Sequence, residues 1–210
     1  MSATAGPPIR LAVCVSGGGT TLQNLVDRIT AGLLAAEVVQ VVAGKPGIGA
    51  IIRAESAGLP VAVEARSGRS VADHSAAIFG RIRDARADLV VLGGFLSLLQ
   101  IPDDYRGRVI NVHPSLIPAF SGKGFHGSHI HQAAIDWGVK LSGCTVHYVD
   151  ATYDTGPIIF QLPVPVLATD TAATLAARVA EAEREALPEA IALYAAGKLR
   201  IDGRRVVISP

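Results

Sequence analysis

The sequence has few of the residues on which small domains stabilised by disulfide bonds or metal ions depend. Among its 210 residues there are two cysteines, one methionine and one tryptophan. Cys14 and Cys144 lie in separate apolar runs and share no CxxC spacing, so we expect buried free thiols in a reducing compartment. A chain of this length can bury about 70% of its unfolded surface without such bonds or ions. We therefore expect one domain over residues 1–210.

Strong net charge and long apolar segments are also missing. Lysine and arginine number 19 against 18 aspartate and glutamate, which argues against nucleic acid or an anionic membrane as the main partner. The longest apolar runs, such as residues 89–99, are shorter than the roughly 18 residues of a membrane span. Residues 1–10 lack the pattern of a signal peptide. The sequence thus predicts a soluble, cytoplasmic protein with small-molecule partners, no nucleic-acid partner and no membrane partner.

Short apolar runs alternate with helical patterns over the first half of the chain. The runs cover residues 11–15, 38–43, 61–63, 89–92 and 109–112. They lack in–out alternation, which is typical of parallel strands covered on both faces. Helical spacing of apolar residues separates them, over about 22–32, 49–57 and 70–86. These patterns predict an α/β fold with a doubly wound, mostly parallel sheet flanked by helices.

The pattern changes after Asn111. A loop rich in proline and glycine reaches about residue 127, and a short helix then ends near Trp137. Polar and apolar side chains alternate around residues 144–149, as in a strand with two different faces. Turn residues at 154–157 predict an antiparallel return strand, so we expect a C-terminal antiparallel hairpin.

A closing helix is expected after this hairpin. Asp170 and Thr171 are typical helix caps, and apolar residues follow at helical spacing. Pro188 is expected to bend or split the helix, and Gly197 to end it.

A glycine-rich loop joins the first expected strand to the first expected helix. A dinucleotide pattern that begins at Gly17 fails, because Leu22 replaces its third glycine, and no Walker lysine follows. What remains is a helix N-terminus with the hydroxyls of Thr20 and Thr21 beside it, which suits a single phosphate. The alternative is a tight strand-to-helix turn that binds nothing.

Two polar residues lie where the strand at 109–112 ends. Asn111 offers an amide donor, and His113 offers an imidazole that titrates near neutrality. Ligands of doubly wound folds bind outside the carboxyl ends of strands, and this pair could stabilise a developing oxyanion there. The alternative is that His113 only caps the strand end.

Other ionisable residues have competing interpretations. Asp154 could be a general base or a solvated turn residue, and Asp150 competes with it.

The histidines His126, His129 and His131 match no established zinc spacing, so we expect no metal site. His147 is interpreted as a structural hydrogen-bonding residue, and Glu183 as part of a solvated helix face.

Three blocks, in their order and spacing, resemble the phosphoribosylglycinamide formyltransferase family of folate-dependent enzymes. They are the glycine loop over 16–23, Asn-Val-His-Pro-Ser-Leu-Ile-Pro over 111–118, and residues 142–147 with Asp-Thr-Gly-Pro over 154–157. The resemblance extends from Arg10 to about Ile201. It implies a Rossmann-like formyltransferase fold without a metal. It also implies transfer of a formyl group from 10-formyltetrahydrofolate to the amine of glycinamide ribonucleotide in purine synthesis.

The resemblance also implies roles for individual residues. Asn111, His113 and Asp154 would be the catalytic set, in which the first two stabilise the oxyanion and Asp154 helps to move the amine proton. The ribonucleotide would be held by Gly18, Gly19, Thr20, Thr21 and Glu183. The reduced folate would contact Arg69, Leu96, Ser97, Leu98, Leu99, Asn111, Val149 and Asp150.

Three positions depart from the family pattern. Thr21 stands where many members have asparagine, and Ala43-Gly44-Lys45 replaces Ser-Asn-Lys or Ser-Asn-Arg. Ser97 stands where lysine or arginine is common. None of these departures changes the catalytic set.

Two alternative functions remain open at this point. A formyltetrahydrofolate hydrolase shares the catalytic set but normally carries an additional N-terminal domain. A non-catalytic sensor of the same fold would bind the phosphate without turnover. The oligomeric state, monomer or homodimer, is also left open.

Overall fold

The computed structural model describes residues 6–209 and comprises two compact units. Unit 1 is Met1–Pro102 and unit 2 is Asp103–Pro210. The expectation of a single domain stays a prediction. None of the helices within residues 6–209 is both long enough and apolar enough to cross a membrane.

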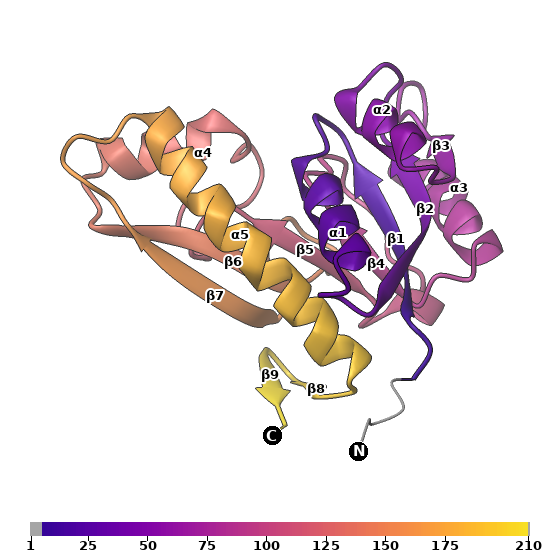
Figure 1. Ribbon diagram of the computed structural model, residues 1–210. Helices are drawn as coiled ribbons and strands as arrows, with labels where there is room; N and C mark the ends of the chain where they lie inside the picture. The colour runs from indigo at the N-terminus through magenta and orange to yellow at the C-terminus, as the bar shows by residue number, and fades with distance from the viewer. Residues whose placement is uncertain (1–5, 210) are drawn as a thin grey trace. The chain divides into compact units, whose positions relative to one another are not determined.

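Over residues 6–102, unit 1 is a parallel sheet flanked by the helices α1, α2 and α3 (Figure 1). Its elements are β1 (Ile9–Val15), α1 (Thr20–Thr30), β2 (Ala36–Ala43), α2 (Gly49–Ser56), β3 (Val61–Val63), α3 (Val71–Asp84) and β4 (Leu89–Leu92). The strand order is β3-β2-β1-β4, and all three pairings are parallel. The predicted parallel strands and helices of this half are confirmed.

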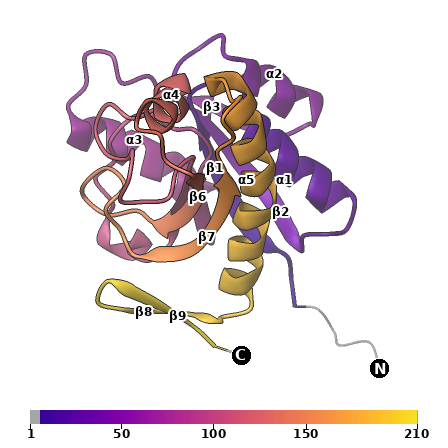
Figure 2. The same ribbon diagram turned by 90° about the vertical axis from the view of Figure 1, so that its left-hand side faces the viewer.

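The core of unit 1 lies on both faces of its sheet. Residues 11–15 of β1 and 41–43 of β2 have no exposed surface, as expected of central parallel strands. Figure 2 shows α3 on one side of the strands and α1 and α2 on the other. The chain winds one way from β1 to β3 and then returns to β4, so the order reverses between β1 and β4. The loops that follow these two strands therefore lie at the switch point, where such sheets bind ligands.

Unit 2 is a mixed sheet with two α-helices. Its elements are a 3₁₀ turn (Asp103–Tyr105), β5 (Val109–His113), α4 (Ser128–Asp136), β6 (Leu141–Tyr148), β7 (Ile158–Pro165), α5 (Ala172–Ala195), β8 (Leu199–Asp202) and β9 (Arg205–Ile208). β6 pairs antiparallel with both β5 and β7, and β9 joins β7 in parallel and β8 antiparallel. The predicted antiparallel hairpin is β6 and β7 and is confirmed.

The strands β8 and β9 are absent from our sequence expectations. Each has four residues, mostly exposed, so neither presents a buried apolar run. The available signal was Asp202-Gly203 between two short segments that contain isoleucine or valine, a common hairpin turn.

The helix α5 begins as predicted but is not split. Thr171 Oγ1 accepts a hydrogen bond from Thr174 N at 3.2 Å, and the pair forms a capping box. The expectation that Pro188 could split the helix is wrong, because one helix runs through it. A proline removes a single helical N–H, and Pro188 is buried among the residues with which α5 packs. Figure 1 shows α5 crossing β6 and β7. Gly197, with φ 66°, follows the C-cap Ala196, as expected of the residue that ends the helix.

Both cysteines are buried free thiols, as predicted. Cys14 lies in β1 and Cys144 in β6. Burial raises the pKa of each thiol to about 12, and the charge of Glu183 adds to the effect at Cys144. These thiols are therefore uncharged and unreactive at neutral pH.

Candidate active site

Two neighbouring strands of unit 2 place polar side chains on one face. Asn111 and His113 are two residues apart on β5, so their side chains point to the same side. The antiparallel register pairs Asn111 with His147 and His113 with Thr145 on β6. Side chains that are directly opposite in such a pair share a face. The opposite face of β6 carries Cys144, Val146 and Tyr148, which confirms the predicted strand with two different faces.

The turn after β6 brings Asp154 to these side chains. Its Oδ2 lies 3.4 Å from His113 Nδ1, and its Oδ1 lies 3.5 Å from Asn111 Nδ2 and 3.7 Å from His147 Nε2. Oδ2 also accepts a hydrogen bond from Gly122 N at 2.8 Å. The structure therefore brings together the three residues expected to form the catalytic set, all within unit 2.

Asp150, the competing carboxylate, is engaged elsewhere. Its Oδ1 accepts hydrogen bonds from Thr152 N at 3.0 Å and from Thr155 Oγ1 at 2.7 Å. This is the local bonding of an Asx turn. Asp150 thus shapes the turn that presents Asp154.

His147 is a site residue whose contact with the catalytic set our sequence analysis missed. Its Nδ1 donates to Tyr148 O at 2.8 Å, so in the neutral ring Nε2 is an acceptor and takes a hydrogen bond from Asn111 Nδ2 at 3.2 Å. This bond orients the Asn111 amide. The signal that could have found it was the alternation along β6, which places His147 on the polar face with Thr145.

The imidazole of His113 is buried between two acceptors. Nε2 donates to Phe120 O at 3.0 Å, and Nδ1 faces Asp154. Burial lowers the pKa of His113 below 6.5, and the nearby Asp154 charge and Phe120 carbonyl only partly oppose this. The resting ring is therefore mostly neutral at pH 7. A neutral ring has one N–H and donates to only one of the two acceptors. Both acceptors receive a hydrogen bond only when the ring gains a second proton.

Asp154 keeps its charge although burial opposes it. Burial raises the pKa of Asp154, but the His147 and His113 side chains and the Gly122 N–H together outweigh burial and lower it. The carboxylate is therefore ionised throughout the neutral pH range. A fixed negative charge beside a neutral imidazole favours protonation of that ring during a reaction.

In unit 1, two residues of α2 donate hydrogen bonds to carbonyl groups of the glycine loop. Ala50 N donates to Gly17 O at 3.1 Å, and Arg53 Nε donates to Gly18 O at 2.9 Å. The C=O and the following N–H of a peptide point in opposite directions, so the N–H groups of Gly18 and Gly19 face away from α2. Gly19 has φ 78°, and a Cβ there would lie 2.7 Å from Ala50. This arrangement leaves loop donors available for an anion at the N-terminus of α1.

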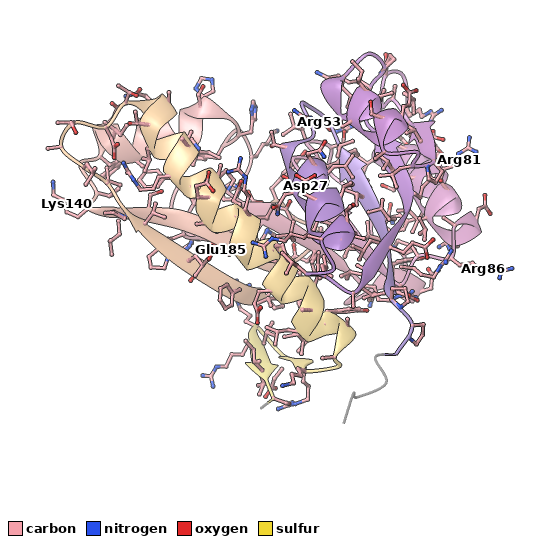
Figure 3. The ribbon with its side chains drawn as sticks, in the orientation of Figure 1. Asp27, Arg53, Arg81, Arg86, Lys140 and Glu185 are labelled. Carbon is pink, nitrogen blue, oxygen red and sulfur yellow. The ribbon has the colours of Figure 1, made fainter. Side chains whose placement is uncertain are left out.

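Arg53 also joins α2 to α1. Its Nη1 lies 3.3 Å from Gln23 Oε1, and Gln23 Nε2 donates to Asp27 at 2.8 Å. Figure 3 labels Arg53 and Asp27 on these two helices. The loop is thus fixed by both helices that flank it.

The segment after β4 is tied to the same loop within unit 1. Ser16 Oγ accepts a hydrogen bond from Leu96 N at 3.2 Å. A Cβ on Gly44 would lie 3.0 Å from Ser16 Oγ and 3.1 Å from the Phe95 ring. The ring and the hydroxyl occupy the room that an asparagine side chain would need, which explains the departure at Gly44.

The expected folate-binding residues of unit 1 differ in exposure. Leu96 is 53% exposed, Ser97 and Leu98 are intermediate, and Leu99 is a core residue at 2%. Arg69 Nη1 forms an ion pair with the buried Glu64 at 2.7 Å, and Arg81 shares that carboxylate at 3.1 Å. Hydrogen bonding to Arg69, aided by Arg81, overcomes burial and lowers the pKa of Glu64. Arg69 is therefore held by a partner within its own unit.

Glu183 on α5 is only partly exposed and is not on a solvated face. Burial raises its pKa to about 7, although the charge of Arg184 opposes this. Its charge also raises the pKa of Cys144, so it is near β6. A half-protonated carboxyl group at pH 7 can both donate and accept hydrogen bonds.

The three histidines of the loop and helix before Trp137 do not converge. His126 and His129 are exposed, with ring centroids 6.3 Å apart, whereas His131 is buried. No group of three His, Cys, Asp or Glu side chains that could hold a metal ion occurs in residues 6–209.

Comparison with known proteins places this site in a family. Residues 9–191 match the formyl transferase family model. The chain is 38% identical to glycinamide ribonucleotide transformylase 1 from Symbiobacterium toebii, with a TM-score of 0.91, and the match covers 98% of this chain and 96% of that one.

Curated relatives give the same result over part of their length. The chain is 40% identical over 199 residues to the trifunctional purine biosynthetic protein adenosine-3 of Drosophila pseudoobscura pseudoobscura, and the match covers 92% of this chain but 14% of that protein. It is 38% identical over 189 residues to the chloroplastic phosphoribosylglycinamide formyltransferase of Vigna unguiculata, covering 87% of this chain and 59% of that protein. The resemblance found in the sequence is confirmed: the chain belongs to the formyl transferase family, and within it to the phosphoribosylglycinamide formyltransferases.

Proposed function

We propose that this chain transfers the formyl group of 10-formyltetrahydrofolate to the amine of glycinamide ribonucleotide, a step of purine synthesis. The observation that supports this most is the convergence of Asn111, His113 and Asp154 in unit 2. An amide donor, a neutral imidazole and an ionised carboxylate are the groups that formyl transfer between two nitrogen atoms requires.

The reaction forms one C–N bond and breaks another. The substrate amine attacks the formyl carbon, and the carbonyl electron pair moves to oxygen. The tetrahedral intermediate then collapses, the bond to the folate nitrogen breaks, and that nitrogen takes a proton. The amine loses one proton and the folate gains one, so the chain must move a proton and stabilise an oxyanion without any net change in itself.

Asn111 and His113 would stabilise the oxyanion. The Asn111 amide is oriented by its bond to His147, and a pre-oriented donor needs no reorganisation as charge develops. His113, neutral at rest, would take the proton released by the attacking amine, through water. As an imidazolium held between Asp154 and the Phe120 carbonyl, it would place a positive charge beside the oxyanion, and its proton would pass through water to the departing folate nitrogen.

Asp154 would make this transfer favourable. Its carboxylate is held in place by Gly122 N and stays ionised, so it stabilises the imidazolium of His113 once that forms. Removal of this charge would keep the position of the side chain but lower the proton affinity of the His113 ring.

The remaining site residues would bind the two substrates. We propose that the glycine-loop residues Gly18, Gly19, Thr20 and Thr21 hold the ribonucleotide phosphate and that Glu183 holds its sugar. The reduced folate would contact Asn111 and the segments that contain Arg69, Leu96, Ser97, Leu98, Leu99, Val149 and Asp150. Support comes from the α2-held loop, whose N–H groups face away from that helix.

The test is deformylation of 10-formyltetrahydrofolate with and without glycinamide ribonucleotide. We expect the folate to lose its formyl group only when the ribonucleotide is present. Equal rates with and without it would identify a formyltetrahydrofolate hydrolase. Binding of the ribonucleotide without any deformylation would identify a sensor.

A further inference from the structure

The backbone between residues 115 and 122, here called the 115–122 loop, touches two members of the catalytic set. Phe120 O accepts the hydrogen bond from His113 Nε2 at 3.0 Å, and Gly122 N donates to Asp154 Oδ2 at 2.8 Å. Phe120 has φ 50°, a left-handed conformation that is uncommon for an aromatic residue. Something outside the catalytic set must therefore hold the loop in this shape.

Ser115 closes the loop from within. Its side chain is fully buried, and its Oγ donates to Ala119 O at 2.6 Å and lies 3.4 Å from Phe120 O. The carbonyl groups of Ala119 and Phe120 are thus gathered around one hydroxyl group. Loss of that hydroxyl would remove the part-buried hydrogen bond that holds the Ala119 carbonyl, which favours rearrangement of the turn.

Two side chains from the sheet hold the same loop from outside. Thr145 Oγ1 donates to Ser115 O at 2.7 Å and accepts from Ile117 N at 3.1 Å. Gln161, opposite Thr145 on β7, donates through Nε2 to Thr145 Oγ1 at 3.0 Å and to Ile117 O at 3.1 Å. The strands that carry the catalytic face therefore also anchor the loop.

We propose that Ser115 is a positioning residue for the catalytic imidazole: by closing the 115–122 loop, its hydroxyl keeps the Phe120 carbonyl on His113 Nε2. The kinetic part of this inference rests on the proposed function. Thr145 and Gln161 support the same loop from β6 and β7.

The 115–122 loop faces His113 together with three titratable side chains. Asp154 faces the ring from the turn after β6, His147 lies on β6, and His131 on α4 is close enough for the His113 charge to lower its pKa. The Phe120 carbonyl raises the pKa of His113 against the effect of burial. When the carbonyl moves away, the pKa of His113 falls and the imidazolium becomes harder to form.

The experiment compares Ser115→Ala with the unchanged full-length chain. NMR titration of labelled histidine should show the pKa of His113 about 0.5 to 1 lower in the variant. We also expect kcat to fall roughly 3- to 10-fold with little change in either KM, because an acid–base group is weakened but not removed. The optimum of kcat should move to lower pH.

A matched control is Ser75→Ala in unit 1. Ser75 is also buried, its hydroxyl donates to Val71 O at 2.7 Å, and it accepts from Gln100 N at 2.8 Å. It should show a comparable fall in thermal stability without a change in the His113 titration. The difference between the variants separates positioning from general packing.

A second variant guards against misfolding of the first. Gln161→Leu removes an exposed side chain, so the protein should fold, and it should lower the pKa of His113 in the same direction by a smaller amount. An unchanged His113 titration in the folded variants, even with lower stability, would overturn the proposal. The titration needs no substrate, so a failure of the proposed enzymatic function would not be mistaken for a failure of this inference.

Discussion

At the scale of single residues, the site depends on a charge that burial does not remove. Asp154 is one-tenth exposed, yet the His147 and His113 side chains and the Gly122 N–H lower its pKa. Asp154→Asn keeps the shape and an acceptor for Gly122 but loses the charge. We expect turnover to fall roughly 10²- to 10⁴-fold, the scale of acid–base groups, in a folded protein whose melting temperature falls only slightly because the ionised carboxylate is lost.

The control for this variant is Asp136→Asn at the end of α4, where the carboxylate accepts a hydrogen bond from Gln132 Nε2 at 2.8 Å. It should keep full activity. Full activity of Asp154→Asn would remove this carboxylate from the mechanism.

Glu183 supplies a pH-dependent prediction. Its pKa is about 7 in the folded chain, against an ordinary 4.5, so the folded state binds more protons than the unfolded state between these values. Stability from this group is complete below pH 4.5 and is lost as pH rises through 7. Glu183→Gln should therefore stabilise the protein at pH 8, by at most about 3 kcal/mol, and have little effect at pH 4.5.

Denaturant unfolding at both pH values measures this effect, and the exposed Glu185→Gln on the same helix is the control (Figure 3). An equal change at both pH values would contradict the account. The variant should also bind the ribonucleotide more weakly, because Glu183 is proposed to hold its sugar.

Residue motifs predicted more of the catalytic set than of its surroundings. Asn111, His113 and Asp154 could be picked out because strand ends and turns are where reactive groups are placed, and because their motifs resemble a family. The alternation along β6 places His147 on the polar face, but its contact with Asn111 depends on a cross-strand register that the sequence does not show. The contribution of Phe120 comes from a backbone carbonyl in a left-handed turn, which has no local composition signal.

At the scale of elements, α2 fixes the glycine loop. Arg53 reaches from α2 to the Gly18 carbonyl, so Arg53→Met should loosen the loop without touching the catalytic set. We expect the KM for the ribonucleotide to rise roughly three- to tenfold, about the net value of one ordinary hydrogen bond, while kcat stays the same. Steady-state kinetics measures both constants.

The control for the loop is Arg28→Met in the last turn of α1, which should change neither constant. A lower kcat with an unchanged KM in Arg53→Met would show that the loop does not bind the phosphate.

Elements with buried apolar runs were predictable, and those without were not. β1, β2 and β4 are buried on both faces, and their runs mark them clearly. β8 and β9 are short and exposed and so leave little hydrophobic pattern. The expected split at Pro188 rested on the loss of one helical hydrogen bond. The packing of α5 against β6 and β7 stabilises the helix in spite of that loss.

At the scale of the whole molecule, the chain carries its proposed functions in two compact units. The glycine loop, proposed to bind the phosphate, belongs to unit 1, and the proposed catalytic set and Glu183 belong to unit 2. The order of the elements from β1 to α5 follows from hydrophobic pattern and turn residues, whereas the substrates follow from family membership. The composition by itself indicated only that the partners are small molecules.

The most direct test of the account follows the formyl carbon itself. With ¹³C in the formyl group of 10-formyltetrahydrofolate, NMR distinguishes a formamide on the ribonucleotide from free formate. We predict that the label appears in the ribonucleotide formamide, in amounts equal to the tetrahydrofolate released. Label that appears as formate, whether or not the ribonucleotide is present, would contradict the account.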